Sequence, residues 1–160
     1  QMTSHDISIM VNGVRRTGSV PARLTLADYL RERLDLTATH LACEHGVCGA
    51  CTVIVDGETA RACLMLTVQA DGSEVTTFEG MTKNGELGPI QEGFWTKHGM
   101  QCGFCTPGFA MTISELLDEN PEPTRDQIVE ALGGNLCRCT GYVKIIEAVE
   151  EAVAIRGGVT

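Results

Sequence analysis

The sequence is poor in basic side chains. Lysine and arginine together supply 12 of its 160 residues, against 21 aspartates and glutamates, which leaves a formal net charge of -9. Proteins that bind nucleic acid usually carry a basic patch that displaces counterions from phosphates, and no stretch of this chain provides one. The composition therefore argues against DNA or RNA as a partner.

Long apolar stretches are also lacking. Segments such as 52–55 and 142–149 fall far short of the ~20 consecutive apolar residues that a membrane-spanning helix needs. The N-terminal stretch Gln-Met-Thr-Ser-His-Asp lacks the basic region and the apolar segment of a secretory signal. We therefore expect no membrane span and a cytoplasmic protein.

The first half of the chain has the pattern of a small sheet. Apolar and polar residues alternate before Asn12-Gly13, and both this dipeptide and Asp56-Gly57 are strong signals for hairpin turns. Strands are predicted at residues 7–11, 14–20, 52–55, 58–63 and 74–77. Between the hairpins, Thr25 is expected to cap a short helix whose single apolar face carries Leu26, Leu30 and Leu34. This half is predicted to be a small α+β unit.

The second half has the pattern of helices. Pro89 and Pro107 can each occupy the first turn of a helix, Thr124 and Gln127 form a capping box for a third, and a fourth is predicted after Gly141. The apolar residues assigned to these helices are Ile90, Phe94, Phe109, Ile113, Leu116, Leu117, Ile128, Val129, Leu132, Val143, Ile146, Val149 and Val153. We interpret the glycine-containing segment 79–88 as a linker and divide the chain into domains 1–79 and 80–160.

Eight cysteines form two sets of four, one set in each half. They are Cys43, Cys48, Cys51 and Cys63 in the first half, and Cys102, Cys105, Cys137 and Cys139 in the second. The first set has the C-x4-C-x2-C spacing, with a distant fourth cysteine, that is typical of plant-type 2Fe-2S ferredoxins. Gly46 and Gly49 lie within it, where small residues allow backbone amides to point at the sulfides.

Three other roles compete for these residues. An even cysteine count permits a disulfide framework, but such frameworks do not require crowded pairs like Cys137-x-Cys139. Zinc often binds a pair such as Cys102-x2-Cys105, although the second half of a zinc site is usually a similar pair. His45 lies where a Rieske-type ligand could be, yet four cysteines already suffice. The favoured interpretation is one 2Fe-2S cluster per set.

Three segments around the cysteines are distinctive. They read Ala-Cys-Glu-His-Gly-Val-Cys-Gly-Ala-Cys-Thr-Val at 42–53, Gln-Cys-Gly-Phe-Cys-Thr-Pro-Gly at 101–108 and Gly-Asn-Leu-Cys-Arg-Cys-Thr-Gly-Tyr at 134–142. These segments closely resemble the signatures of the iron-sulfur subunit of the xanthine oxidase family of molybdenum hydroxylases. The resemblance extends from about Ile7 to Val153. Ala42 departs from the glycine that is usual in the family, but alanine is nearly as small.

The resemblance implies an α+β protein: a plant-type ferredoxin-like (β-grasp) domain followed by an all-α four-helix-bundle domain, each holding one 2Fe-2S cluster. It also implies a large partner subunit with molybdopterin, expected in its cytosine dinucleotide form, and a medium partner subunit with FAD. Electrons would pass from molybdenum to the helical-domain cluster, then to the ferredoxin-like cluster, then to FAD. The chain would be the iron-sulfur subunit of an oxidoreductase, assembled as a dimer of heterotrimers, and would turn over no substrate alone.

By the same resemblance, Gln101 would bind the pterin, and the Cys139 side of the second cluster would approach it. Judged without the resemblance, Gln101 is a solvated residue that precedes a helix. Arg138 is expected either to donate hydrogen bonds to an anionic cluster or to pair with a carboxylate.

Phe94 and Trp95 are expected to be core or interface anchors. His5, His40 and His98 are expected to be surface or packing residues, and Glu115, Asp118, Glu119 and Glu122 to form a solvated face.

The substrate of the whole enzyme is expected to be an N-heterocyclic aromatic such as quinoline, with carbon monoxide or an aldehyde as the alternatives. A rival of another class is a free-standing two-cluster ferredoxin, which would not copurify with a molybdenum subunit. A third interpretation, a zinc-bound interaction module, would contain no iron.

Overall fold

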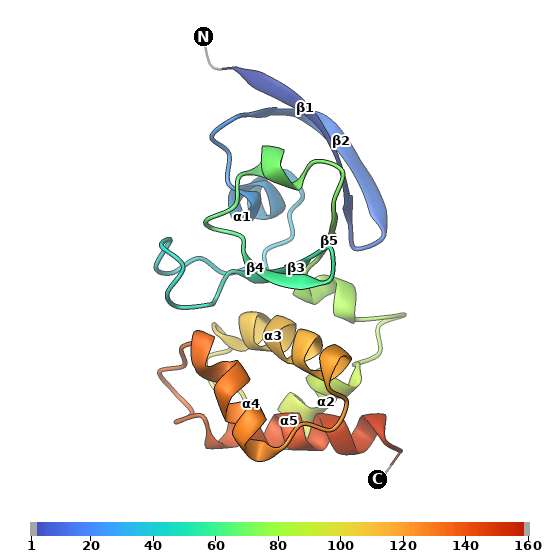
Figure 1. Ribbon diagram of the computed structural model, residues 1–160, viewed down its shortest axis with the longest axis vertical. Coiled ribbons are helices and arrows are strands. Elements are labelled where there is room, and N and C mark those ends of the chain that lie inside the picture. The colour runs from blue at the N-terminus through green and yellow to red at the C-terminus, as the bar shows by residue number, and fades with distance from the viewer. Residues whose placement is uncertain (1–2, 159–160) are drawn as a thin grey trace.

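The first half of the chain forms a mixed five-stranded sheet in a computed structural model that describes residues 3–158 (Figure 1). The strands are β1 (Ser4–Val11), β2 (Val14–Pro21), β3 (Thr52–Val55), β4 (Glu58–Arg61) and β5 (Glu74–Thr76), in the order β2-β1-β5-β3-β4. β1 and β5 run parallel, whereas the other neighbours are antiparallel. Both predicted hairpins are confirmed: Asn12-Gly13 and Asp56-Gly57 have the positive φ angles that such two-residue turns require.

A short helical segment packs on the sheet. It consists of α1 (Leu26–Asp28) and a π-helical turn (Tyr29–Arg33). Thr25 caps it as predicted, because its Oγ1 accepts a hydrogen bond from the amide of Asp28 at 3.1 Å. The wider π-turn changes the helical repeat, so Leu26 and Leu30 are fully buried while Leu34 packs at the edge of the core. The three-leucine face predicted for a regular helix is therefore only partly correct.

Four helices form the second half, as predicted. They are α2 (Pro89–Thr96), α3 (Thr106–Glu119), α4 (Arg125–Ala131) and α5 (Val143–Arg156). Short 3-10 turns lie at Thr67–Ala70 in the first half, at Phe78–Met81 between the halves and at Leu132–Gly134 after α4. The capping box of α4 is confirmed: Thr124 Oγ1 accepts from the Gln127 amide at 3.3 Å, and Gln127 Oε1 accepts from the Thr124 amide at 2.8 Å. The α+β class, with a helical second half, is confirmed.

The predicted faces of α4 and α5 are partly wrong. Ile128 and Leu132 are buried, but Val129 is half exposed because successive helical residues lie about 100° apart around the axis. Val143 is also half exposed. The buried residues of α5 are Ile145, Ala148, Val149 and Ala152, which follow the i, i+3, i+4, i+7 spacing of one helix face. The prediction followed the larger apolar residues and overlooked the alanines.

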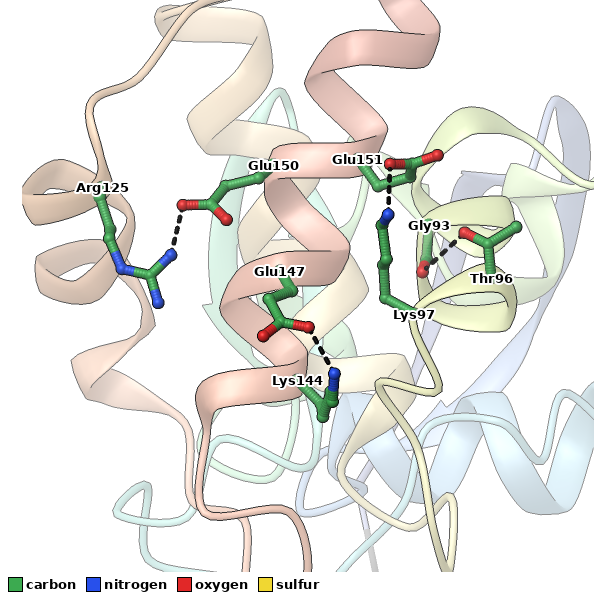
Figure 2. A network of polar contacts seen from close by, with 8 residues as sticks. All are labelled: Gly93, Thr96, Lys97, Arg125, Lys144, Glu147, Glu150 and Glu151. Atoms are coloured by element: carbon green, nitrogen blue, oxygen red, sulfur yellow. Dashed lines mark hydrogen bonds and ion pairs between the residues drawn. The ribbon is translucent and has the colours of Figure 1, made fainter. Parts of the chain in front are cut away.

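Small residues bring α2 and α5 into close contact. A Cβ added at Gly93 would lie only 2.3 Å from the carbonyl oxygen of Ala148. Phe94 is buried beside this contact, whereas Trp95 is 69% exposed, so only Phe94 is a core anchor. Figure 2 shows three partly exposed ion pairs around α5, namely Lys97–Glu151, Arg125–Glu150 and Lys144–Glu147. Exposed pairs of this kind are worth about 0–1 kcal/mol each, so apolar packing holds the bundle together.

α3 lies against β3 and β4 and joins the two halves (Figure 1). Glu115 on this helix accepts hydrogen bonds from both the amide and the hydroxyl of Thr59 on the edge strand β4. The prediction that Glu115 belongs to a solvated face is therefore wrong: its carboxylate satisfies donors of a strand that has no further strand beside it. Asp118 is exposed and pairs with Arg156 at 2.8 Å.

No helix in the described part of the chain is long and apolar enough to cross a membrane.

Candidate metal centres

The cysteines of the first half meet at the loop that leads into β3. Cys43, Cys48 and Cys51 lie along this loop, and Cys63 follows in the turn after β4, which is shorter than predicted. Gly46 and Gly49 have φ angles of 87° and 73°, a conformation that residues with a side chain rarely adopt. The glycines therefore wrap the loop around its cysteines.

Backbone N–H groups of this loop point at sulfur. The amides of His45 and Cys48 donate to Sγ of Cys43, the second at 3.4 Å, and these hydrogen bonds lower the pKa of the Cys43 thiol to about 6. Cys51 is buried, and its burial raises the pKa of its thiol to about 11. The Cys43 thiol is thus readily deprotonated, whereas metal binding must drive the deprotonation of the buried Cys51 thiol.

The second set of cysteines has an inner and an outer pair. Cys105 directly precedes α3 and Cys137 packs against the helical core, whereas Cys102 and Cys139 are exposed. Burial raises the pKa of the Cys105 thiol to about 12. The hydroxyl of Tyr142 accepts a hydrogen bond from the amide of Cys137 at 3.0 Å and steadies the inner pair. The outer pair faces the surface of the chain.

In both sets the four thiols are arranged as two contacting pairs. The contacting thiols are Cys43 with Cys48, Cys51 with Cys63, Cys105 with Cys137, and Cys102 with Cys139, the last pair with sulfurs 3.5 Å apart. This arrangement fits a 2Fe-2S group, in which four thiolates are shared between two irons. Tetrahedral zinc, with bonds of about 2.3 Å, would instead draw four sulfurs equally close. Within residues 3–158, no group of three or more histidine, cysteine or acidic side chains converges on one such point.

The two loops that carry these cysteines touch each other. The amide of Leu136, the neighbour of Cys137, donates to the carbonyl of Cys48 at 2.9 Å. His40 stacks on Phe104 with ring centroids 4.7 Å apart, and its Nδ1 lies 2.7 Å from the Phe104 carbonyl oxygen. Because electron transfer weakens steeply with distance, two centres held on contacting loops are well placed to exchange electrons.

Gln101 and Cys139, both predicted to lie near the pterin, are also close together in the structure. Nε2 of Gln101 donates to the carbonyl of Cys139 at 3.2 Å, and both residues are exposed. Arg138 is exposed beside them. The ring of His45 is turned to the backbone, with Nδ1 near the Cys43 carbonyl oxygen.

Comparison with known proteins agrees with this geometry. Residues 9–76 match the family described as 2Fe-2S iron-sulfur cluster binding domain, and residues 77–150 match the family described as 2Fe-2S binding domain. The nicotine 6-hydroxylase small subunit of Paenarthrobacter nicotinovorans is 54% identical over 147 residues, which cover 92% of this chain and 88% of that protein. The chain belongs to the small iron-sulfur subunits of the xanthine oxidase family of molybdenum hydroxylases.

Two further similarities support this membership. The small subunit is 53% identical over 152 residues to caffeine dehydrogenase subunit gamma of Pseudomonas sp. strain CBB1, covering 93% of this chain and 91% of that one. A chain in the crystal structure of quinoline 2-oxidoreductase from Pseudomonas putida 86 superposes with a TM-score of 0.92 at 46% identity, covering 98% and 99% of the two chains. The predicted pair of 2Fe-2S groups and the role as an iron-sulfur subunit of an oxidoreductase are thereby confirmed.

Three residues that join the two loops of this small subunit were not predicted from the sequence. They are Asn135, which lies in the segment 134–142, and Arg61 and Thr112. The only indication for Asn135 was its place in the segment 134–142, since its partners Gly49 and Thr112 are distant in sequence. No local pattern could have indicated Arg61 or Thr112, because their partners are distant in sequence.

Proposed function

We propose that this small subunit relays electrons from the molybdopterin of a large partner subunit to the FAD of a medium partner subunit. The observation that carries the proposal is the pair of contacting loops, one of which opens to the surface at Cys102 and Cys139. Electrons would enter at this exposed pair, cross the contact between Leu136 and Cys48, and leave from the sheet half.

The residues that hold the two groups are proposed from the pairing of the thiols. Cys43, Cys48, Cys51 and Cys63 hold one group, and Cys102, Cys105, Cys137 and Cys139 hold the other. When bound, each 2Fe-2S group supplies one-electron transfer. The amides around Cys43 stabilise negative charge on its sulfur, and the buried thiols limit access of water. Because each group would supply only one-electron transfer, the chain alone should turn over no substrate.

Gln101 is proposed to bind the pterin of the large subunit. Its Nε2 is already tied to the carbonyl of Cys139, which fixes the side chain beside the exposed sulfurs. Its Oε1 can then accept a hydrogen bond from an N–H group of the pterin. Cys139 and Gln101 would together form the contact between this chain and the molybdenum centre.

The substrate is proposed to be an N-heterocyclic aromatic compound. The relatives described above carry the names of nicotine, caffeine and quinoline, all nitrogen heterocycles.

We further propose a cytosine dinucleotide form of the molybdopterin, a dimer of heterotrimers and a cytoplasmic location. A division into domains 1–79 and 80–160 is supported by the two separate apolar cores, of which the second also takes up Phe78 and Met81.

The test is to produce the chain with its large and medium partners and add quinoline or nicotine without an electron acceptor. The visible absorbance of the iron-sulfur groups should bleach, and an added acceptor should restore it. The same complex carrying Cys102→Ala should still bind substrate but should fail to bleach. Bleaching by aldehydes or carbon monoxide alone would contradict the substrate class, and turnover by the isolated chain would contradict the relay.

A further inference from the structure

Asn135 joins the two cysteine loops through its side chain. It is 2% exposed and lies two positions before Cys137. Its Nδ2 donates to the carbonyl of Gly49 at 3.1 Å, and its Oδ1 accepts from the hydroxyl of Thr112 at 2.9 Å. One buried amide therefore connects the loop of the first cysteine set, the loop of the second set and helix α3.

The backbone around Asn135 is packed as closely as glycine allows. A Cβ at Gly49 would lie 2.5 Å from the carbonyl oxygen of Gly134 and 2.6 Å from Nδ2 of Asn135. Arg61 braces the same contact, because its guanidinium donates to the carbonyl of Gly134 at 2.8 Å and to the hydroxyl of Thr52 at 2.6 Å. That hydroxyl in turn donates to the carbonyl of Gly49. The contact is thus tied by side chains from both halves.

We propose that Asn135 is a positioning residue for electron transfer between the two iron-sulfur sites. The proposal rests on the proposed function and deepens it by naming the side chain that fixes the distance between the sites. The side chain of Asn135 bonds to Thr112 and Gly49 and not to a cysteine sulfur. It acts by keeping Leu136, the neighbour of Cys137, bonded to Cys48. Without it, fewer hydrogen bonds join the two loops, and they should separate more readily.

Asparagine meets two opposite demands at this position. The Gly49 carbonyl accepts from Nδ2 and the Thr112 hydroxyl donates to Oδ1, and an amide presents both a donor and an acceptor at this length. Aspartate has the same shape but would set a second oxygen against the Gly49 carbonyl, and a buried polar atom without a partner is destabilising. The isosteric Asn135→Asp variant is therefore the sharpest perturbation.

The experiment uses the full chain loaded with both groups. Iron and labile sulfide content, the magnetic splitting between the two reduced groups by electron paramagnetic resonance, and hydrogen exchange at the Leu136 amide are measured for wild type, Asn135→Asp and Asn120→Asp. The control changes an asparagine whose side-chain amide bonds within the helical half, donating to Gln127 and accepting from the amide of Glu122. We expect Asn135→Asp to keep its iron, to lose magnetic splitting and to exchange the Leu136 amide severalfold faster, with no such change in the control.

The outcomes are distinct. Full iron content with unchanged splitting and unchanged exchange at Leu136 would overturn the positioning role. If Asn135→Asp loses iron, Thr112→Val decides: a smaller loss of splitting supports the role, and wild-type splitting refutes it. If the wild-type chain binds no iron, the proposed electron relay is refuted, and so is the electron-transfer role of Asn135. Exchange at the Leu136 amide would then test only whether Asn135 holds the two loops together.

Discussion

The substitution Gly108→Ala tests how the two halves are joined. Gly108 lies in the first turn of α3, where an added Cβ would sit 2.3 Å from the carbonyl oxygen of Gly49 and 3.2 Å from Cα of Ala50. Ordinary contacts begin near 3.4 Å, so helix and loop must separate by about 1 Å. Because the obstacle is backbone rather than the end of a flexible side chain, it cannot rotate away.

The magnitude follows from two opposing effects. Overpacking of this kind costs about 1–3 kcal/mol, and alanine recovers about 1 kcal/mol through its higher helix propensity. Because the obstacle is backbone, we expect an overpacking cost in the upper part of that range, about 2–3 kcal/mol. The net loss is then about 1–2 kcal/mol, which lowers the thermal midpoint of a chain of this size by about 2–8 °C. The separation should also expose the amide of Leu136 to exchange, since its acceptor lies in the displaced loop.

The assay compares thermal midpoints at one scan rate for the chain loaded with both groups. The matched control is Gly133→Ala, where an added Cβ would meet nothing within 4 Å and the backbone needs no positive φ. The control should be unchanged or slightly more stable. A Gly108→Ala variant with the midpoint of wild type, and with Leu136 still protected, would refute the close contact between the halves.

The other predictions concern the sites and the surface. The loaded chain should contain four irons and four labile sulfides, since each matched domain binds one 2Fe-2S group; two irons with one zinc would disprove the second group. Cys48→Ala should abolish one paramagnetic signal and keep the other, and Cys102→Ala should do the converse; loss of both signals from either variant would contradict separate sites. Gln101→Ala should lower turnover or molybdenum content of the complex with iron unchanged, and normal values for both would exclude its pterin contact. Lys97→Ala, which removes the exposed pair with Glu151, should shift stability by less than about 1 kcal/mol in denaturant titrations, and a larger effect would mean that the pair supports the bundle.

The sequence was most informative where local chemistry decides the outcome. Asn12-Gly13 and Asp56-Gly57 specify their turns because few other residues tolerate those φ angles, and Thr124 with Gln127 specifies a helix start by reciprocal hydrogen bonds. The cysteine spacing likewise predicted two sets of metal ligands.

The sequence was least informative where distant segments decide it. Val129 is as apolar as Ile128, but only the position of the neighbouring helices determines which of the two is buried. Glu115 reads as a surface carboxylate until β4 is placed beside it. Asn135 has no partner nearby in sequence, because Gly49 lies 86 residues away. Tertiary contacts of this kind leave no periodic signal.

The hydrogen bonds from Thr59 to Glu115 also bear on whether the sheet can pair with a strand of another molecule. An edge strand with free donors invites a strand from another molecule to add to the sheet. At β4 the amide of Thr59 is already occupied by the α3 carboxylate, so this helix obstructs the addition of a sixth strand there. The opposite edge, β2, carries Arg15, Arg16 and Gly18, whose charge and weak strand propensity discourage sheet extension. The sheet is thus protected from intermolecular strand addition at one edge by a neighbouring helix and at the other by its own sequence.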